Sequence, residues 1–202
     1  MARSARATTT APGGLFAIVL AAGTSSRFGM PKQLARFRGT TLVAAALRLA
    51  EEVCGRRSVL VAGSDWQAVA DACKPLAGYL VINDDFADGM GSSIASGADA
   101  VAHVATGLLV LLADQPLVDA RHLQRMVRRW ADSPGDIVAS EYAGKCGPPV
   151  IFPARCFAGL RKLAGDLGAR AILDAEAARV QKIPCADAAV DIDRPEDLER
   201  LS

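Results

Sequence analysis

The feature of this sequence that most constrains its fold is a series of short apolar runs separated by segments of helical character. The first run, residues 16–22, is wholly apolar and ends at Gly23, which is typical of a strand buried on both faces of a sheet. Similar runs follow at residues 58–62, 79–82, 108–112 and 136–139. This alternation predicts an α/β domain of three layers, in which a mostly parallel, Rossmann-like sheet carries helices on both faces.

Two of the intervening segments carry clear helix signals. Residues 41–53 are rich in Ala and Leu. Residues 123–130 place apolar side chains at helical spacing, and Asp119 precedes them as a predicted N-cap.

The pattern loosens in the last third of the chain, where glycine and proline interrupt it. This part is predicted to form a subregion of the same domain, with short helices near residues 157–163 and 168–178. A short strand is expected at residues 190–193. Pro195 suits the first position of a final helix.

Composition favours one domain that acts on small molecules. The chain has 202 residues, and 23 Lys and Arg against 22 Asp and Glu give a formal net charge of +1. Such a balance lacks the basic field that nucleic-acid binders use, so no nucleic-acid partner is expected. Residues 15–202 are predicted to be a single domain, and residues 1–14 a disordered tail.

The cysteines and the lengths of the apolar runs indicate the cellular compartment of the protein. The 5 cysteines are odd in number and form no C-x-x-C pair, which indicates neither a disulfide framework nor a zinc site. No apolar run approaches the ~20 residues that span a bilayer, so no membrane segment is expected. We expect a cytoplasmic protein.

The loop that follows the first strand carries the most informative chemistry. Residues 20–34 read L-A-A-G-T-S-S-R-F-G-M-P-K-Q-L and combine a glycine, hydroxyl groups, Arg27 and Lys32 at a strand end, where open α/β sheets bind ligands. Amides near Gly23 can face phosphate oxygens, and the two basic side chains can supply charge. The loop matches neither the P-loop nor the G-x-G-x-x-G pattern. Its predicted nucleotide-binding residues are Leu20, Ala21, Ala22, Gly23, Thr24, Ser25, Ser26, Arg27 and Lys32.

This loop resembles the L-A-A-G-x-S-x-R-x-G-x-x-K loop of the MobA-like nucleotidyltransferases, and especially of the molybdenum cofactor cytidylyltransferases. Five further blocks resemble that family in order, so the resemblance covers about residues 16–198. These blocks are residues 88–97, 112–116, 147–152, 165–170 and 191–198. The resemblance implies a nucleotidyltransferase fold and Mg²⁺ as cofactor.

Three aspartates are candidate metal ligands. Asp114 follows the most hydrophobic strand, so its carboxylate should lie at the sheet edge beside the first loop, and the resemblance assigns it to Mg²⁺. Asp191 and Asp193 alternate along a predicted strand and should point to opposite faces, so we favour Asp193 as the second ligand. The alternative for Asp193 is the N-cap of the last helix.

Two other blocks supply candidate substrate contacts. Ser92 and Ser93 lie in G-M-G-S-S, which either faces the nucleobase, as the resemblance implies for Ser93, or starts a helix that runs to about residue 101. The predicted acceptor-binding residues are Gly147, Pro148, Asp166 and Arg170. Many members of that family have His at the position of Pro148. The alternative interpretation of Asp166 and Arg170 is a solvent-exposed pair at the start of a helix.

These parts predict nucleotide transfer from an NTP to a phosphorylated acceptor, with release of pyrophosphate. A phosphate monoester, with a second pKa of about 6, is already an anion at neutral pH and needs no general base. His103 and His122 lie away from the motifs and are expected on the surface. We assign catalytic roles to Arg27, Lys32 and Asp114, because transfer requires positioning and charge neutralisation.

The resemblance implies CTP as donor, the terminal phosphate of molybdopterin-type molybdenum cofactor as acceptor, and a receiving molybdoenzyme as a further partner. The alternatives are a guanylyltransferase on the same cofactor and a transferase for another phosphorylated small molecule. A more distant one is an NAD-type dinucleotide-binding oxidoreductase, which should show the G-x-G-x-x-G turn. A nonenzymatic binding protein would not require both Lys32 and Asp114.

Overall fold

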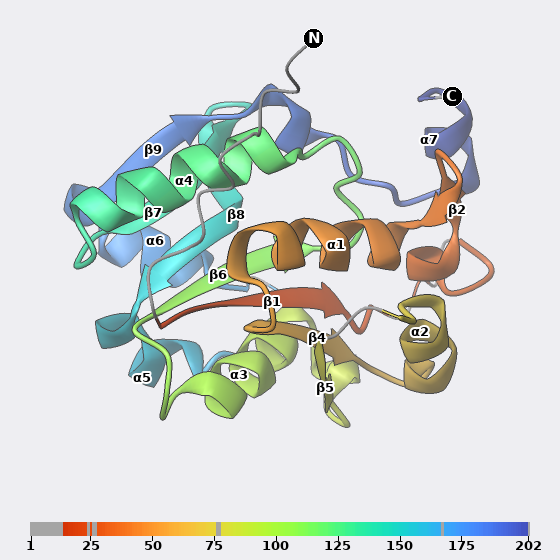
Figure 1. The fold of residues 1–202 in the computed structure, drawn as a ribbon, viewed down its shortest axis with the longest axis horizontal. Coiled ribbons are helices and arrows are strands. Elements are labelled where there is room, and N and C mark those ends of the chain that lie inside the picture. Colours follow the sequence, from red (N-terminus) through yellow and green to blue (C-terminus); the bar gives the residue numbers. More distant parts are fainter. Residues whose placement is uncertain (1–13, 24, 26–27, 76–77, 167, 202) are drawn as a thin grey trace, which may run out of the picture.

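The computed structural model describes residues 14–23, 25, 28–75, 78–166 and 168–201. The expected tail, residues 1–14, lies outside these ranges except for Gly14, whose carbonyl accepts hydrogen bonds from the Thr106 and Gly107 amides. The other described residues build a central sheet with helices around it (Figure 1).

The described part of the chain forms a seven-stranded sheet in the order β5-β4-β1-β6-β8-β7-β9. The strands are β1 (Leu15–Ala21), β4 (Ser58–Ala62), β5 (Tyr79–Ile82), β6 (Gly107–Leu112), β7 (Ile137–Tyr142), β8 (Lys145–Pro153) and β9 (Val180–Pro184). Within this sheet β8 alone runs antiparallel to its neighbours, β6 and β7. The predicted mostly parallel sheet is confirmed.

The centre of the sheet determines where a ligand can bind. β1 pairs in parallel with β4 on one side and with β6 on the other. The order of strands therefore reverses at β1, and open α/β sheets bind ligands in the crevice that such a reversal leaves at the carboxyl ends of the strands. Here those ends belong to β1 and β6.

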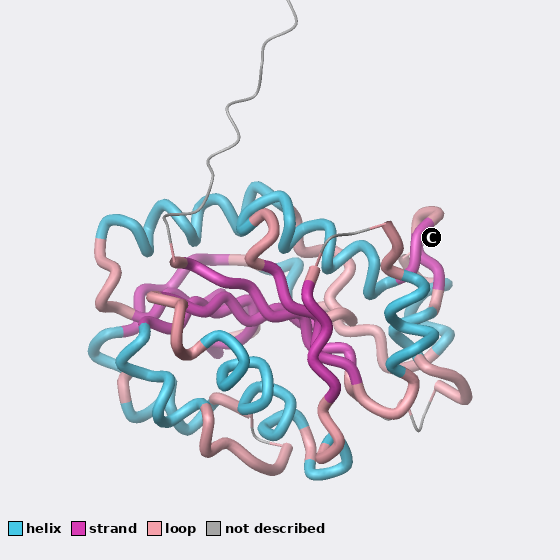
Figure 2. Tube along the Cα trace, turned by 60° about the horizontal axis from the view of Figure 1, so that its bottom comes forward, coloured by secondary structure: helices cyan, strands magenta, loops and turns pink. Residues whose placement is uncertain are grey.

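Helices cover both faces of the sheet (Figures 1 and 2). α1 (Leu42–Cys54) and α4 (Ala120–Asp132) share one apolar core with one face of the strands. α3 (Met90–Val101), α5 (Phe157–Leu160) and α6 (Arg170–Ala175) contribute to the core on the opposite face. The three predicted layers are confirmed. None of the helices in the described ranges is long and apolar enough to cross a membrane.

Smaller elements lie toward the carboxyl end of β1 (Figure 1). They are α2 (Trp66–Ala72), the hairpin of β2 (Arg36–Phe37) and β3 (Thr40–Thr41), and α7 (Pro195–Glu199). Pro195 begins α7 as predicted.

The last strand expected from the sequence is absent, because residues 190–193 form no strand. Their backbone crosses the end of β6 instead, where the Ile192 amide donates to the Asp114 carbonyl at 2.9 Å. The Ile192 side chain is buried with Phe28 and Phe37. Packing of this apolar residue together with that backbone hydrogen bond, rather than the ladder of a strand, holds the segment.

Two further strands differ from the expectation. β5 is an exposed edge rather than a buried strand, and Tyr79 is 62% exposed. The sequence does not predict β8, because its prolines resemble strand breaks. The pairing register shifts beside Ala139, so that Pro148 and Pro149 lie in an irregular stretch where their missing N–H groups break no ladder bond.

His122 is not on the surface, contrary to the expectation, and its side chain is only 2% exposed. Arg125 donates to its Nδ1 (3.1 Å), so its Nε2–H can donate to Ser140 Oγ at 2.8 Å. Ser140 in turn donates to the Pro149 carbonyl at 2.8 Å and so supports the proline-rich part of β8. Burial and the charge of Arg125 lower the pKa of His122 to about 4, against the opposing effect of Asp119 and Asp187.

This lowered pKa predicts a loss of stability in mild acid. Below about pH 6.5 the unfolded chain protonates His122, whereas the folded chain keeps it neutral down to a pKa of about 4. The stabilisation is complete above this window and falls as the pH falls through it, by up to about 3 kcal/mol. We expect His122→Gln to flatten the dependence of unfolding free energy on pH, measured by urea denaturation.

The matched control is His103→Gln, because His103 is exposed. Equal flattening in both variants, or none in His122→Gln, would contradict the assignment.

Candidate active site

A cavity of about 250 Å³ lies at the carboxyl ends of β1 and β6. It is lined by the loop after β1, by η1 (Lys32–Leu34) and η2 (Phe86–Asp88), by the start of α3 and by residues after β6. The predicted nucleotide-binding residues that line it are Leu20, Ala21, Ala22, Gly23, Lys32 and Ser93. Thr24, Ser26 and Arg27 lie outside the described residues, so their predicted contacts stay predictions.

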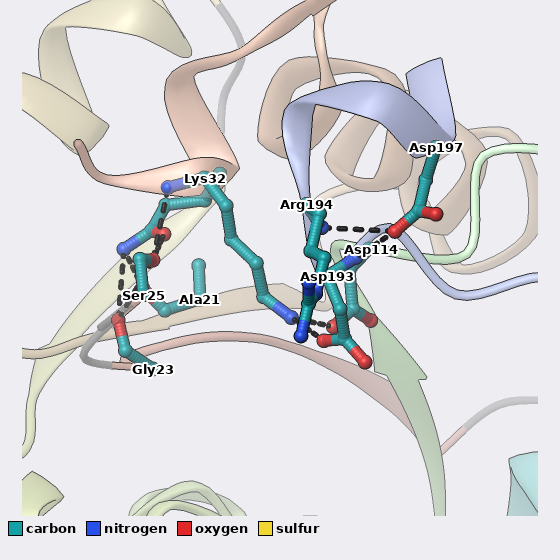
Figure 3. Close-up of polar contacts among 9 residues, drawn as sticks. Ala21, Gly23, Ser25, Lys32, Asp114, Asp193, Arg194 and Asp197 are labelled. Atoms are coloured by element: carbon teal, nitrogen blue, oxygen red, sulfur yellow. Dashed lines mark hydrogen bonds and ion pairs between the residues drawn. The ribbon is translucent and has the colours of Figure 1, made fainter. Parts of the chain in front are cut away.

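Lys32 connects three segments that are far apart in the sequence (Figure 3). Its Nζ lies 2.6 Å from Asp114 Oδ2 and 2.9 Å from Asp193 Oδ1. Burial lowers the pKa of Lys32, but the two carboxylates outweigh burial and raise it above its ordinary value. The ammonium group thus neutralises a pair of carboxylates at the edge of the cavity.

The same carboxylates have the chemistry of a magnesium site. Asp114 Oδ1 is buried and has no hydrogen-bond partner among the described residues. Mg²⁺ is usually held by one or two carboxylates together with substrate phosphates, so this orphaned oxygen fits such an ion. The described side chains contain no preformed cluster of three metal-ligating groups. The fit therefore requires oxygens from a substrate as well.

The structure also separates the roles of the last two aspartates. Lys32 pairs with Asp193, whereas partial burial and the charge of Asp114 raise the pKa of Asp191. Asp193 does not cap α7, because Arg194 is the N-cap residue and Asp197 accepts from the Asp193 and Arg194 amides, at 3.0 and 2.8 Å. The Asp193 carboxylate therefore does not cap the helix, and it points toward Lys32 (Figure 3).

Sequence reasoning missed Gln33, which fastens the loop after β1. Gln33 is 5% exposed, and its Nε2 donates to the carbonyls of Ala21 (3.1 Å) and Gly23 (3.4 Å). Its Oε1 accepts from Ser25 Oγ at 3.0 Å, and Ser25 Oγ accepts from the Lys32 amide at 2.9 Å. Ser25, predicted to bind nucleotide, is used here within the loop. The sequence signal for this role was the position of a glutamine directly after Lys32, in the loop predicted to bind phosphates.

The start of α3 is docked closely on the segment that carries Asp166. The Gly91 amide donates to the Gly165 carbonyl at 2.8 Å. A Cβ on Gly91 would lie 2.7 Å from the Ala164 carbonyl carbon, and Gly89 has a φ of +93°. The glycines of G-M-G-S-S therefore permit a contact that larger residues would prevent, and Asp166 reaches the cavity.

The remaining predicted acceptor residues line a neighbouring cavity of about 140 Å³. Gly147, Pro148 and Arg170 belong to it, and Met90 lines both cavities. The structure thus brings Asp166 to the first cavity and the other three to the second, with Met90 between the two spaces.

Comparison with known proteins identifies the family. The model of the MobA-like NTP transferase domain matches residues 17–181. The chain belongs to this family, which confirms the resemblance seen in the sequence. Asp191 and Asp193 lie beyond the matched residues, so their place at the site rests on the structure.

Two relatives and two solved structures show how far the similarity extends. Nicotine blue oxidoreductase of Paenarthrobacter nicotinovorans is 34% identical over 195 residues, which cover 91% of this chain and 94% of that protein. The purine catabolism protein PucB of Bacillus subtilis is 30% identical over 198 residues, with coverages of 93% and 95%.

Among solved structures, an Rv0371c homologue from Mycobacterium sp. strain JC1 has a TM-score of 0.81 at 30% identity, covering 93% of this chain and 94% of that one. The manganese complex of Mycobacterium tuberculosis Rv0371c has a TM-score of 0.74 at 28% identity, with coverages of 93% and 97%.

Proposed function

We propose that this protein transfers a nucleoside monophosphate from an NTP to a phosphorylated acceptor and releases pyrophosphate. The observation that carries the proposal is the position of Lys32, which contacts Asp114 and Asp193 beside a cavity lined by the loop after β1. A cationic side chain and cation-binding carboxylates are what a reaction between phosphates requires in one place.

The residues divide the work by charge. Lys32 contacts the α-phosphate, where negative charge develops during transfer, and amides of the loop after β1 contact the departing pyrophosphate. Arg27 is assigned to the pyrophosphate from its place in the sequence. The acceptor phosphate is already anionic, so the described site needs no histidine base.

Asp114 and Asp193 are the residues that would hold a divalent cation, which we propose to be Mg²⁺. When bound, such an ion supplies charge that screens the phosphates and orients them. The orphaned Asp114 Oδ1 supports this assignment, and the structure of Rv0371c in complex with manganese shows that a relative binds a divalent metal.

CTP is the proposed donor and molybdopterin-type molybdenum cofactor the proposed acceptor, with a molybdoenzyme receiving the product in the cytoplasm. Met90 lines both cavities, where we expect its side chain to disfavour a purine, and we assign the acceptor to the second cavity. A guanylyltransferase acting on the same cofactor and a transferase for another phosphorylated small molecule are the nearest alternatives.

An oxidoreductase is the second candidate, because one relative, 34% identical, bears that name. The sequence lacks the G-x-G-x-x-G turn typical of dinucleotide-binding oxidoreductases. Oxidation of NADH or NADPH, followed by absorbance with candidate acceptors, would favour this reading if it occurred without consumption of NTP.

The direct test is pyrophosphate release on mixing the protein with NTP, Mg²⁺ and molybdenum cofactor. We expect release that depends on the acceptor, with a higher kcat/KM for CTP than for GTP, because a base that leaves buried polar groups unpaired is rejected in the transition state. Preference for GTP would select the guanylyltransferase. No release with any NTP would refute the proposal for this acceptor.

Asp114→Asn tests the roles of the site residues. We expect transfer to be lost and the melting temperature to stay close to that of the wild type, because the change removes a charge at the edge of the cavity rather than a packed side chain. The matched control is Asp71→Asn, which removes an exposed carboxylate that pairs with Lys74. Near-normal turnover of Asp114→Asn at saturating Mg²⁺ would contradict the assignment.

A further inference from the structure

Asn83 is a buried amide that the roles assigned so far do not use. It follows β5 directly and is 2% exposed. Its Nδ2 donates to Ser92 Oγ at 2.9 Å and to Ser93 Oγ at 3.0 Å. Its Oδ1 accepts from the Asp85 amide at 3.1 Å and from Ser96 Oγ at 3.3 Å.

The Asp85 contact determines which way the Asn83 amide faces. A backbone N–H can only donate, so the atom beside it must be the acceptor Oδ1. The other end of the amide is then Nδ2, whose two protons go to the two serine hydroxyls. Both Ser92 Oγ and Ser93 Oγ therefore act as acceptors toward Asn83.

The two hydroxyl protons have different destinations. Ser92 Oγ lies 2.8 Å from the carbonyl oxygens of both Asp85 and Gly89, and these two acceptors share its single proton. The proton of Ser93 has no acceptor among the described residues, although Ser93 lines the 250 Å³ cavity. A hydroxyl that already accepts from Asn83 has its own proton left to donate into that cavity.

We propose that Asn83 is a specificity-determining residue. By donating to Ser93, it makes the Ser93 hydroxyl a hydrogen-bond donor toward the nucleobase, so that the cavity takes a base with an acceptor atom at this point. Cytosine offers such atoms in its ring nitrogen N3 and its carbonyl O2. The inference rests on the proposed function, because it assigns the cavity to a nucleotide.

The polarity can be reversed by one isosteric change. In Asn83→Asp the Oδ1 contacts remain possible, but the group facing the serines becomes an acceptor. The Ser93 proton then turns toward the new carboxylate, and Ser93 presents lone pairs to the base instead of a proton. In the complex with CTP, the lone pairs of Ser93 Oγ would then face an acceptor atom of cytosine, and no hydrogen bond could form between them.

The experiment is a double-mutant cycle on ligand binding, measured by calorimetry in the presence of Mg²⁺. Wild type, Asn83→Asp, Ser93→Ala and the double variant are compared for CTP and for inorganic triphosphate, which has no base. We expect the ratio of CTP affinity to triphosphate affinity to fall about tenfold in each single variant, and no further in the double variant. The carboxylate introduced by Asn83→Asp repels the phosphates of both ligands, so its general effect cancels in the ratio of the two affinities.

Ser96→Ala is the matched control, because it removes a contact to Asn83 Oδ1 and leaves Nδ2 in place. Its affinity ratio should equal that of the wild type. If the two single losses add in the double variant, Asn83 acts only on the structure and the proposal is wrong. Ser93→Ala leaves Asn83 intact, so an unchanged ratio in that variant overturns the proposal even where Asn83→Asp fails to fold.

The outcomes also separate this inference from the proposed function. A wild-type protein that binds none of CTP, GTP and triphosphate would refute nucleotide transfer itself. A protein that binds both, with a ratio insensitive to Asn83 and Ser93, would keep the function and lose the inference.

Discussion

The contact of Lys32 with Asp114 and Asp193 is the interaction on which the candidate site depends. It joins the loop after the first strand, the end of the central strand β6 and the segment before the last helix. Each partner is supported separately: Gln33 fastens the loop, β6 is buried in the sheet, and the Ile192 amide ties the last segment to the Asp114 carbonyl. The geometry of the charges thus follows from the fold and not from the charges alone.

Two buried amides perform similar tasks on either side of the cavity. Gln33 donates a hydrogen bond to a carbonyl at the start of the loop after β1, and Asn83 donates to the serine hydroxyls at the start of α3. Burial makes these bonds hard to exchange with water, because a buried polar group that loses its partner carries a desolvation cost of about 1–3 kcal/mol. These bonds position the described parts of the loop and the helix start without any substrate, and positioning is most of what phosphate transfer requires.

The sequence predicted the parts of the molecule that local patterns determine. Apolar runs located β1, β4 and β6, and the strand ends indicated that Asp114 would lie beside the loop that carries Lys32. Long-range packing decided the rest. β8 was missed because its prolines lie in an irregular stretch that only the partner strand reveals, and His122 is buried because Ser140 receives its proton. The position of Gln33 directly after Lys32 is a signal in the sequence, whereas the contacts of Asn83 depend on how the segment between β5 and α3 folds, which spacing does not determine.

Lys32 contacts the same two carboxylates that we propose hold a divalent cation, so without nucleotide the ammonium group and the cation should compete for them. This competition is tested by the affinity for Mn²⁺ without nucleotide, measured by electron paramagnetic resonance of the free ion. We expect Lys32→Gln to bind Mn²⁺ at least about tenfold more tightly than the wild type, because removal of the ammonium leaves both carboxylates uncompensated. Lys74→Gln, which removes an exposed lysine paired with Asp71, should leave the affinity unchanged. An Mn²⁺ affinity of Lys32→Gln equal to or weaker than that of the wild type would show that Lys32 and the cation do not compete for these carboxylates.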